Sequence, residues 1–111
     1  MTERFQLGNL LIDRRAYEVS VAGERIELTF YEFEILLHLA ENAGAVVARR
    51  QLLAGVWGEE QSGHVQKLTV HISRLRRKLA QAAPWCIETV PKRGYMLSDR
   101  QQLGTGAPLS S

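Results

Sequence analysis

The first 28 residues alternate between apolar and polar positions with a period close to two. Four apolar clusters, at 5–7, 10–12, 17–21 and 26–28, are separated by turn-forming residues such as Gly8-Asn9 and Ala22-Gly23. This alternation is typical of short strands that bury one face. The pattern predicts an antiparallel sheet of three or four strands, with one hairpin closed by the turn at Ala22-Gly23-Glu24.

The period changes at Leu28, where a helical pattern begins. Thr29 followed by Glu32 is typical of a capping box, in which the hydroxyl accepts a backbone N–H and the carboxylate reaches back to the cap residue. The next apolar residues recur at helical spacing and define one face: Phe33, Leu36, Leu37 and Ala40. Asn42-Ala43-Gly44 ends this first predicted helix.

A second, shorter helix is predicted over residues 49–57, after an extended pair at Val46-Val47. Gly58 stops it. Ala48 occupies its cap position, and because alanine has no side-chain acceptor we expect the start of this helix to fray. A polar loop over 59–63 then leads to the longest predicted helix, from His64 to about Ala80.

The last part of the chain returns to an extended pattern after Pro84. Residues 86–90 and 95–97 predict a hairpin with a basic tip at 91–94. The residues from Ser98 onward are rich in Gln, Gly and Ser. We therefore expect one domain over residues 1–97 and a disordered tail over 98–111.

Charge is distributed unevenly along the chain. Residues 1–60 hold six Lys and Arg and ten Asp and Glu, whereas residues 61–111 hold eight basic and two acidic residues. A domain with one positive side suits a polyanion or an acidic surface. A solvated basic face without a partner would explain the same count, so charge alone leaves both readings open.

The third predicted helix has an apolar seam and a basic ridge. Its seam steps by three and four residues: Val65, Leu68, Ile72, Leu75 and Leu79. On a helical wheel the opposite ridge consists of Lys67, Val70, His71, Arg74, Arg77 and Lys78, without Asp or Glu. Solvated helix faces usually mix both signs of charge. The ridge therefore favours a nucleic acid, because a helix fits the major groove, where Arg pairs with guanine and Val meets the thymine methyl.

The neighbouring elements strengthen this interpretation. A short helix, a loop and a basic helix resemble a helix-turn-helix whose second helix reads DNA. The basic hairpin tip at Lys92-Arg93 would lie beside that helix, where it could enter the minor groove or bind phosphates. Pro91 stiffens the tip, and Gly94 permits a positive φ. Together these elements predict an α+β fold, a winged helix-turn-helix.

Several segments resemble the OmpR/PhoB-type DNA-binding domain of bacterial transcription regulators. Leu28-Thr29 through Glu32-Phe33 and Leu36-Leu37 is similar to its "LT-x-x-EF-x-LL" segment. Residues 70–79 match its recognition-helix pattern, and Glu88-Thr89-Val90 through Arg93-Gly94-Tyr95 matches its wing. The resemblance covers about residues 5–97. It implies an N-terminal antiparallel sheet of four strands, three helices and a C-terminal β-hairpin wing.

The resemblance also implies roles for individual residues. Arg74 and His71 would lie at the DNA surface, Arg76 near the DNA backbone, and Thr89, Lys92 and Arg93 in the wing. On the wheel Arg76 lies towards the seam, so its long side chain should reach out to the helix edge. The combined DNA-binding candidates are Lys67, Val70, His71, Arg74, Arg76, Arg77, Lys78, Thr89, Lys92 and Arg93.

Two departures from the family pattern bear on regulation. The tip reads Pro-Lys-Arg-Gly-Tyr, similar to the ToxR/CadC-like branch, where many phosphorylation-controlled members carry Arg-Gly-x-Gly-Tyr. The family's receiver domain is absent from these 111 residues, so we expect either an excised effector domain of a two-component response regulator or a regulator controlled otherwise. The segment Trp57–His64 corresponds to one that contacts RNA polymerase in related proteins, and its shortness here does not favour activation.

Other classes of function have little support in the sequence. His64 and His71 lack the i, i+4 spacing of a metal-chelating pair, so neither a metal nor another cofactor is expected. No constellation of residues supports an enzyme. The single Cys86 and the absence of a long apolar run favour a reduced, cytoplasmic setting without membrane contact.

The expected partner is double-stranded DNA, bound sequence-specifically to regulate transcription. A domain of this size usually gains specificity by pairing on two half-sites, so DNA-dependent homodimerisation on direct repeats is a further hypothesis. The alternative is a winged-helix interaction module that binds an acidic protein.

Overall fold

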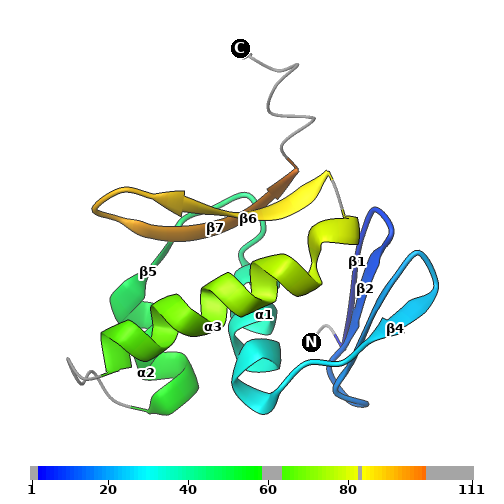
Figure 1. Cartoon of the computed structure of the whole chain (residues 1–111), viewed down its shortest axis with the longest axis horizontal. Helices are drawn as coiled ribbons and strands as arrows, with labels where there is room; N and C mark the ends of the chain where they lie inside the picture. Colours follow the sequence, from blue (N-terminus) through cyan, green and yellow to red (C-terminus); the bar gives the residue numbers. More distant parts are fainter. Residues whose placement is uncertain (1–2, 59–63, 83, 100–111) are drawn as a thin grey trace.

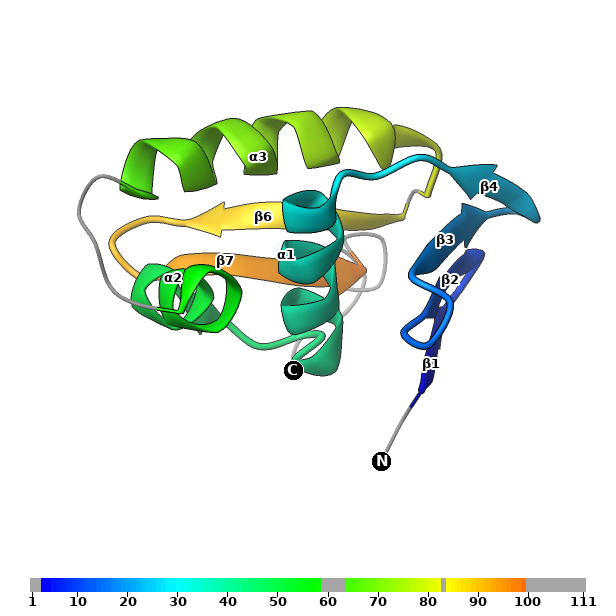
Figure 2. The ribbon, with the colours of Figure 1, turned by 90° about the horizontal axis from the view of Figure 1, so that it is seen from below.

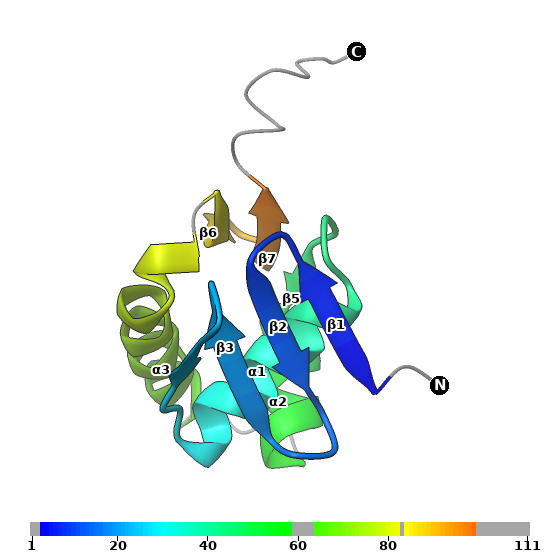
Figure 3. The same ribbon diagram turned by 90° about the vertical axis from the view of Figure 1, so that its right-hand side faces the viewer.

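Four antiparallel strands form the N-terminal sheet, as predicted. The computed structural model of the chain describes residues 3–58, 64–82 and 84–99, with only the backbone at 64 and 65. The strands are paired in chain order: β1 (Arg4–Leu7), β2 (Leu10–Asp13), β3 (Glu18–Val21) and β4 (Glu24–Ile26). The sheet lies in front of α1 and α2 in Figure 3.

The register of this sheet places its apolar side chains on one face. Leu10 pairs with Val21 and Ile12 with Val19. All four are at most 2% exposed, because alternate residues of a strand point to the same side of the sheet. The sheet therefore closes one side of the core, as the alternation predicted.

Helix α1 (Phe30–Glu41) begins at the predicted capping box. The Glu32 N–H donates to Thr29 Oγ1 at 3.3 Å, and the Thr29 N–H donates to Glu32 Oε1 at 2.9 Å. The helix contacts α2, α3 and β7, so it is the centre of the helical part. Figure 2 shows it between the N-terminal sheet and α2.

Helix α2 (Arg49–Trp57) follows the two-residue strand β5 (Val47–Ala48) and has the predicted bounds. Gly58 ends it with φ 87°, and its N–H donates to Ala54 O at 2.9 Å. Ala48 makes no side-chain cap bond, as expected, but Gln51 Oε1 accepts the Ala48 N–H at 2.9 Å. This bond is the half of a capping box that does not need a cap side chain.

Helix α3 (His64–Lys78) is followed by the short 3₁₀ helix η1 (Ala80–Ala82), so the α-helix ends before the predicted Ala80. Four seam residues are at most 3% exposed: Leu68, Ile72, Leu75 and Leu79. The fifth, Val65, has a side chain outside the described residues. Within the described ranges, α3 and the other helices lack the length and apolar character needed to cross a bilayer.

The C-terminal hairpin consists of β6 (Trp85–Val90) and β7 (Gly94–Asp99), and β7 also pairs with β5. Figure 1 shows the hairpin along one side of α3, with its turn at the end opposite the N-terminal sheet. Strand β7 continues to Asp99, beyond the boundary predicted at 97. Ser98 is 2% exposed and donates to Glu88 Oε2 at 2.6 Å, which corrects its assignment to the tail. The predicted tail from residue 100 onward lies outside the described residues.

Candidate nucleic-acid interface

The outer side of α3 presents the basic ridge. Lys67, Arg74 and Arg77 are exposed, and Val70 is 45% exposed although it is apolar. Arg74 makes no hydrogen bond or ion pair with any residue that the structure describes. The guanidinium predicted to read bases therefore faces solvent, since the buried seam turns the opposite side of the helix outwards.

His71 is only half-buried, unlike the exposed members of the ridge. Its ring centroid lies 5.6 Å from that of Tyr31 in α1 and 5.9 Å from that of Trp57 in α2. Its Nδ1 is buried without a hydrogen-bond partner among the described residues. Burial lowers the pKa of His71, Arg74 and Lys67 lower it further, and Glu32 opposes them. The His71 imidazole is thus neutral and packs at the junction of the three helices, although His71 belongs to the ridge.

Lys78, unlike Arg74, forms an ion pair. Its Nζ donates to Glu32 Oε1 at 2.7 Å, and the Glu32 side chain is 1% exposed. The ridge itself contains no Asp or Glu, but Lys78 pairs with a carboxylate from another element. The wheel considers only the residues of α3, whereas this carboxylate comes from α1.

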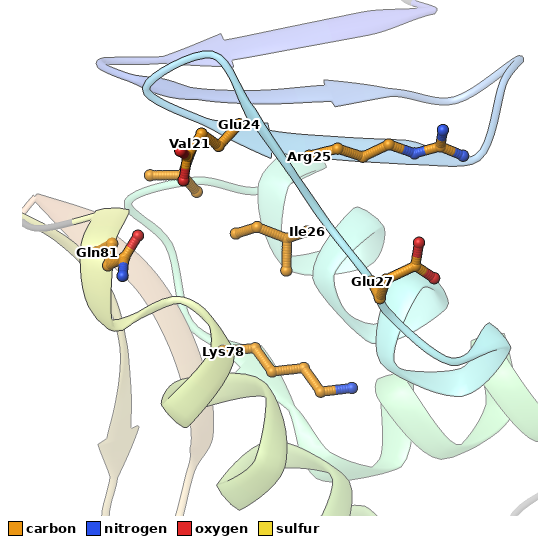
Figure 4. Close-up of a pocket in the computed structure, with 7 residues that line it drawn as sticks. All are labelled: Val21, Glu24, Arg25, Ile26, Glu27, Lys78 and Gln81. Carbon is orange, nitrogen blue, oxygen red and sulfur yellow. The ribbon is translucent and has the colours of Figure 1, made fainter.

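A shallow pocket next to this ion pair shows how Lys78 is oriented. The pocket has a volume of 320 Å³ and lies between β4 and the end of α3. Figure 4 shows the Lys78 side chain extending below Ile26 and Glu27, away from Gln81 of η1. Lys78 thus lies at the junction between α3, α1 and β4.

Arg76 connects α3 to the hairpin. Its Nε donates to Ile87 O at 2.9 Å, and its Nη2 donates to Thr89 Oγ1. The long side chain leaves the helix edge, as expected from the wheel. Because its N–H groups bind β6, Arg76 orients the hairpin on α3, and the hydroxyl of Thr89 is its acceptor. Two residues predicted to contact DNA thus contact each other.

The basic tip of the hairpin is exposed. Pro91, Lys92 and Arg93 are all exposed, and the Arg93 N–H closes the turn on Val90 O at 2.9 Å. Lys92 adopts a positive φ of 66°. Gly94 has φ 152°, and a Cβ atom there would lie 2.1 Å from Val47 O. The glycine is needed because β5 approaches the backbone of β7 too closely for any side chain.

Arg49 and Tyr95 were not predicted as site residues. The Cζ of Arg49 lies 5.9 Å from the centre of the Tyr95 ring, and the Cζ of Arg76 lies 6.0 Å from it. The only sequence signal was a pair of adjacent arginines at the start of α2. Their position beside the wing depends on Val47 pairing with Tyr95, which joins distant parts of the chain.

The family model described as "Transcriptional regulatory protein, C terminal" matches residues 23–97. The chain belongs to this family, the OmpR/PhoB-type domains. Sensory transduction protein RegX3 of Mycolicibacterium smegmatis is 39% identical to this OmpR/PhoB-type domain over 94 residues, 83% of this chain and 41% of RegX3. The chain thus spans less than half the length of that relative.

Solved OmpR/PhoB-type domains have the same fold. The Klebsiella pneumoniae RstA DNA-binding domain, in complex with the RstA box, superposes with a TM-score of 0.78 and 34% identity over 88% of this chain and 99% of RstA's. The DNA-binding domain of E. coli CadC superposes with a TM-score of 0.73 and is 29% identical, over 86% of this chain and 92% of the CadC chain. The predicted winged helix with its N-terminal sheet is thereby confirmed. Residues 59–63, most of the segment predicted to meet RNA polymerase, lie outside the described residues.

Proposed function

We propose that this domain binds double-stranded DNA sequence-specifically and regulates transcription, with α3 in the major groove and the hairpin on the adjacent backbone or minor groove. Transcription regulation is the function of the family, which is not a family of enzymes. The single observation that carries the proposal is the exposed side of α3, where Arg74 lacks any partner among the described residues.

The ridge residues take different roles in this proposal. Arg74 reads a base edge, because a free guanidinium can bind guanine O6 and N7 together. Val70 suits a thymine methyl, and Lys67 and Arg77 suit phosphates. Lys92 and Arg93 bind the backbone beside the wing. Arg76 and Thr89 act mainly by orienting the hairpin, and Lys78 acts by fixing the end of α3.

Further partners belong to the same proposal. Pairing on direct repeats would give two half-sites, and the stoichiometry of gel-shifted complexes with one and two half-sites tests it. Contact with RNA polymerase through the segment after Trp57 is tested by transcription in vitro. Access to chromosomal DNA requires the cytoplasmic side of the membrane, which is where we place the domain.

Salt-titrated binding to duplex DNA tests the main proposal. Sites are first selected from a random duplex pool, and affinity is then measured for the selected and a scrambled duplex at several salt concentrations. We expect log affinity to fall linearly with log salt on both duplexes, with tighter binding to the selected one. Equal affinity for both, or binding only to an acidic protein, would instead indicate an interaction module.

A further inference from the structure

His71 belongs to a group of three rings, one from each helix. Its ring centroid lies 5.6 Å from that of Tyr31 in α1 and 5.9 Å from that of Trp57 in α2. The Tyr31 and Trp57 rings stack on each other with 5.0 Å between their centroids. Packed rings attract one another beyond the area that they bury, so the imidazole is one of the contacts that hold α3 against α1 and α2.

The buried edge of the imidazole offers no acceptor for a second N–H. Nδ1 of His71 is buried and makes no hydrogen bond to any residue that the structure describes. A neutral imidazole can leave a lone pair at that nitrogen, whereas an imidazolium carries an N–H at both nitrogens. Protonation with the ring in this position would therefore bury an N–H without a partner, which is unfavourable.

The neighbouring charges of α3 also disfavour a cation at this place. Lys67 precedes His71 by four residues and Arg74 follows it by three, so both lie on the same side of the helix, and both are exposed. Burial is the largest cause that lowers the pKa of His71, and these two cations lower it further.

The groups that α1 and α2 bring to the junction do not offset these effects. The Glu32 carboxylate of α1 attracts a proton to His71, but it already accepts from Lys78 Nζ and from the Thr29 N–H. The rings of Tyr31 and Trp57 are uncharged. Within the described part of the chain, no group at the junction can thus accept a hydrogen bond from Nδ1 where the ring now lies.

We propose that His71 forms a proton-dependent contact between α3 and the other two helices: the neutral imidazole stays in the junction, and the imidazolium leaves it. Outside the junction both N–H groups reach water. Tyr31 and Trp57 then lose their ring contact with α3, so the stability of the domain and its affinity for DNA fall together on acidification. The release of the ring depends on the domain alone, whereas the effect on DNA binding rests on the proposed function.

The direction of the stability change follows from the lowered pKa. Because the folded domain holds the pKa of His71 below its ordinary value of 6.5, the unfolded chain takes up the proton first as pH falls. The contribution of His71 to stability is therefore complete above the ordinary value and is lost as pH falls through the folded-state pKa.

NMR of the free wild-type domain tests the release of the ring. Histidine ring signals and ring-to-ring NOEs are followed from about pH 8 to about pH 5. The NOEs from His71 to Tyr31 and Trp57 should disappear as His71 titrates, while the methyl signals of the core stay dispersed. His38 is the internal control, because its Nδ1 lies 2.8 Å from Glu34 O and its contacts should persist. NOEs that survive protonation of His71 would overturn the proposal.

The effect on DNA binding is measured with the selected duplex at one salt concentration over the same pH range. The wild-type chain, His71→Gln and the control His38→Gln are each compared with their own affinity at about pH 8. The wild-type chain and His38→Gln should lose affinity in parallel, by at most about tenfold per pH unit because one proton is involved. His71→Gln should lose much less, since glutamine does not titrate.

The remaining outcomes separate this inference from the proposed function. Equal pH dependence in the wild-type chain and His71→Gln, or a wild-type affinity that rises on acidification relative to that variant, would overturn the coupling to DNA. If the wild-type chain binds no duplex at any pH, the proposed function fails, and the NMR titration still decides whether the ring is released. The titration needs no variant, so it also decides the matter if His71→Gln does not fold.

Discussion

Lys78 Nζ lies 2.7 Å from Glu32 Oε1 and joins the end of α3 to the start of α1. The carboxylate of Glu32 also accepts the Thr29 N–H, so one buried group caps α1 and anchors α3. This arrangement links the end of α3 to the capping box of α1.

The Glu32 carboxylate should make stability depend on pH in the acid range. Burial raises the pKa of Glu32, but the bonds from Lys78 and Thr29 outweigh burial and hold the pKa below its ordinary value of 4.5. A lowered folded-state pKa stabilises the fold above the ordinary value, and this contribution is lost as pH falls through the folded-state pKa. Urea unfolding from pH 7 downwards should therefore show a smaller acid loss of stability in Glu32→Gln, which retains the cap acceptor. An identical pH dependence in both chains would contradict this account.

Lys78 should matter for stability more than for DNA binding. Lys78→Gln leaves the Glu32 charge buried without its partner, and we expect a loss of about 1–2 kcal/mol in the free energy of unfolding, reduced by the partial exposure of Lys78. The slope of log affinity against log salt should stay at the wild-type value. If the slope of log affinity against log salt were lower by about one, Lys78 would be shown to contact a DNA phosphate.

Arg74 should carry sequence preference. Arg74→Ala should cost about 1–3 kcal/mol at the selected site and much less on scrambled DNA, because only a base contact distinguishes the two. Lys92→Ala is the matched comparison, since a phosphate contact should weaken binding to both duplexes equally. Equal losses on both duplexes in Arg74→Ala, measured by fluorescence anisotropy, would show that Arg74 contacts the backbone.

Gly94 should tolerate no side chain. A Cβ atom there would lie 2.1 Å from Val47 O at φ 152°, so Gly94→Ala must disturb the pairing of β5 with β7. We expect a loss of about 2–4 kcal/mol on urea unfolding. Gly23→Ala is the control: Gly23 also has a positive φ, 85°, but open space around it, so only the backbone cost of about 1–2 kcal/mol applies. Similar losses in the two variants would mean that the close approach of β5 is unimportant.

Local sequence patterns were enough to predict the helices and strands and the side of α3 that faces outwards. Alternation in residues 10–21, the Thr29–Glu32 box and the seam of α3 are local patterns, because each depends on residues within one element or one turn. Strand β7 and the end of α3 were misjudged by two residues. Helix and strand ends depend on tertiary neighbours, such as Glu88 for Ser98.

Which basic residues bind other parts of the domain depends on long-range packing, which local patterns do not contain. Lys78 pairs with a carboxylate 46 residues away, Arg76 binds β6, and Arg49 meets Tyr95 through the pairing of β5 with β7. A helical wheel places these side chains around an axis but contains nothing about the other elements that surround it. Periodicity therefore located the exposed basic side of α3, whereas long-range packing decided which of the basic residues bind other parts of the domain.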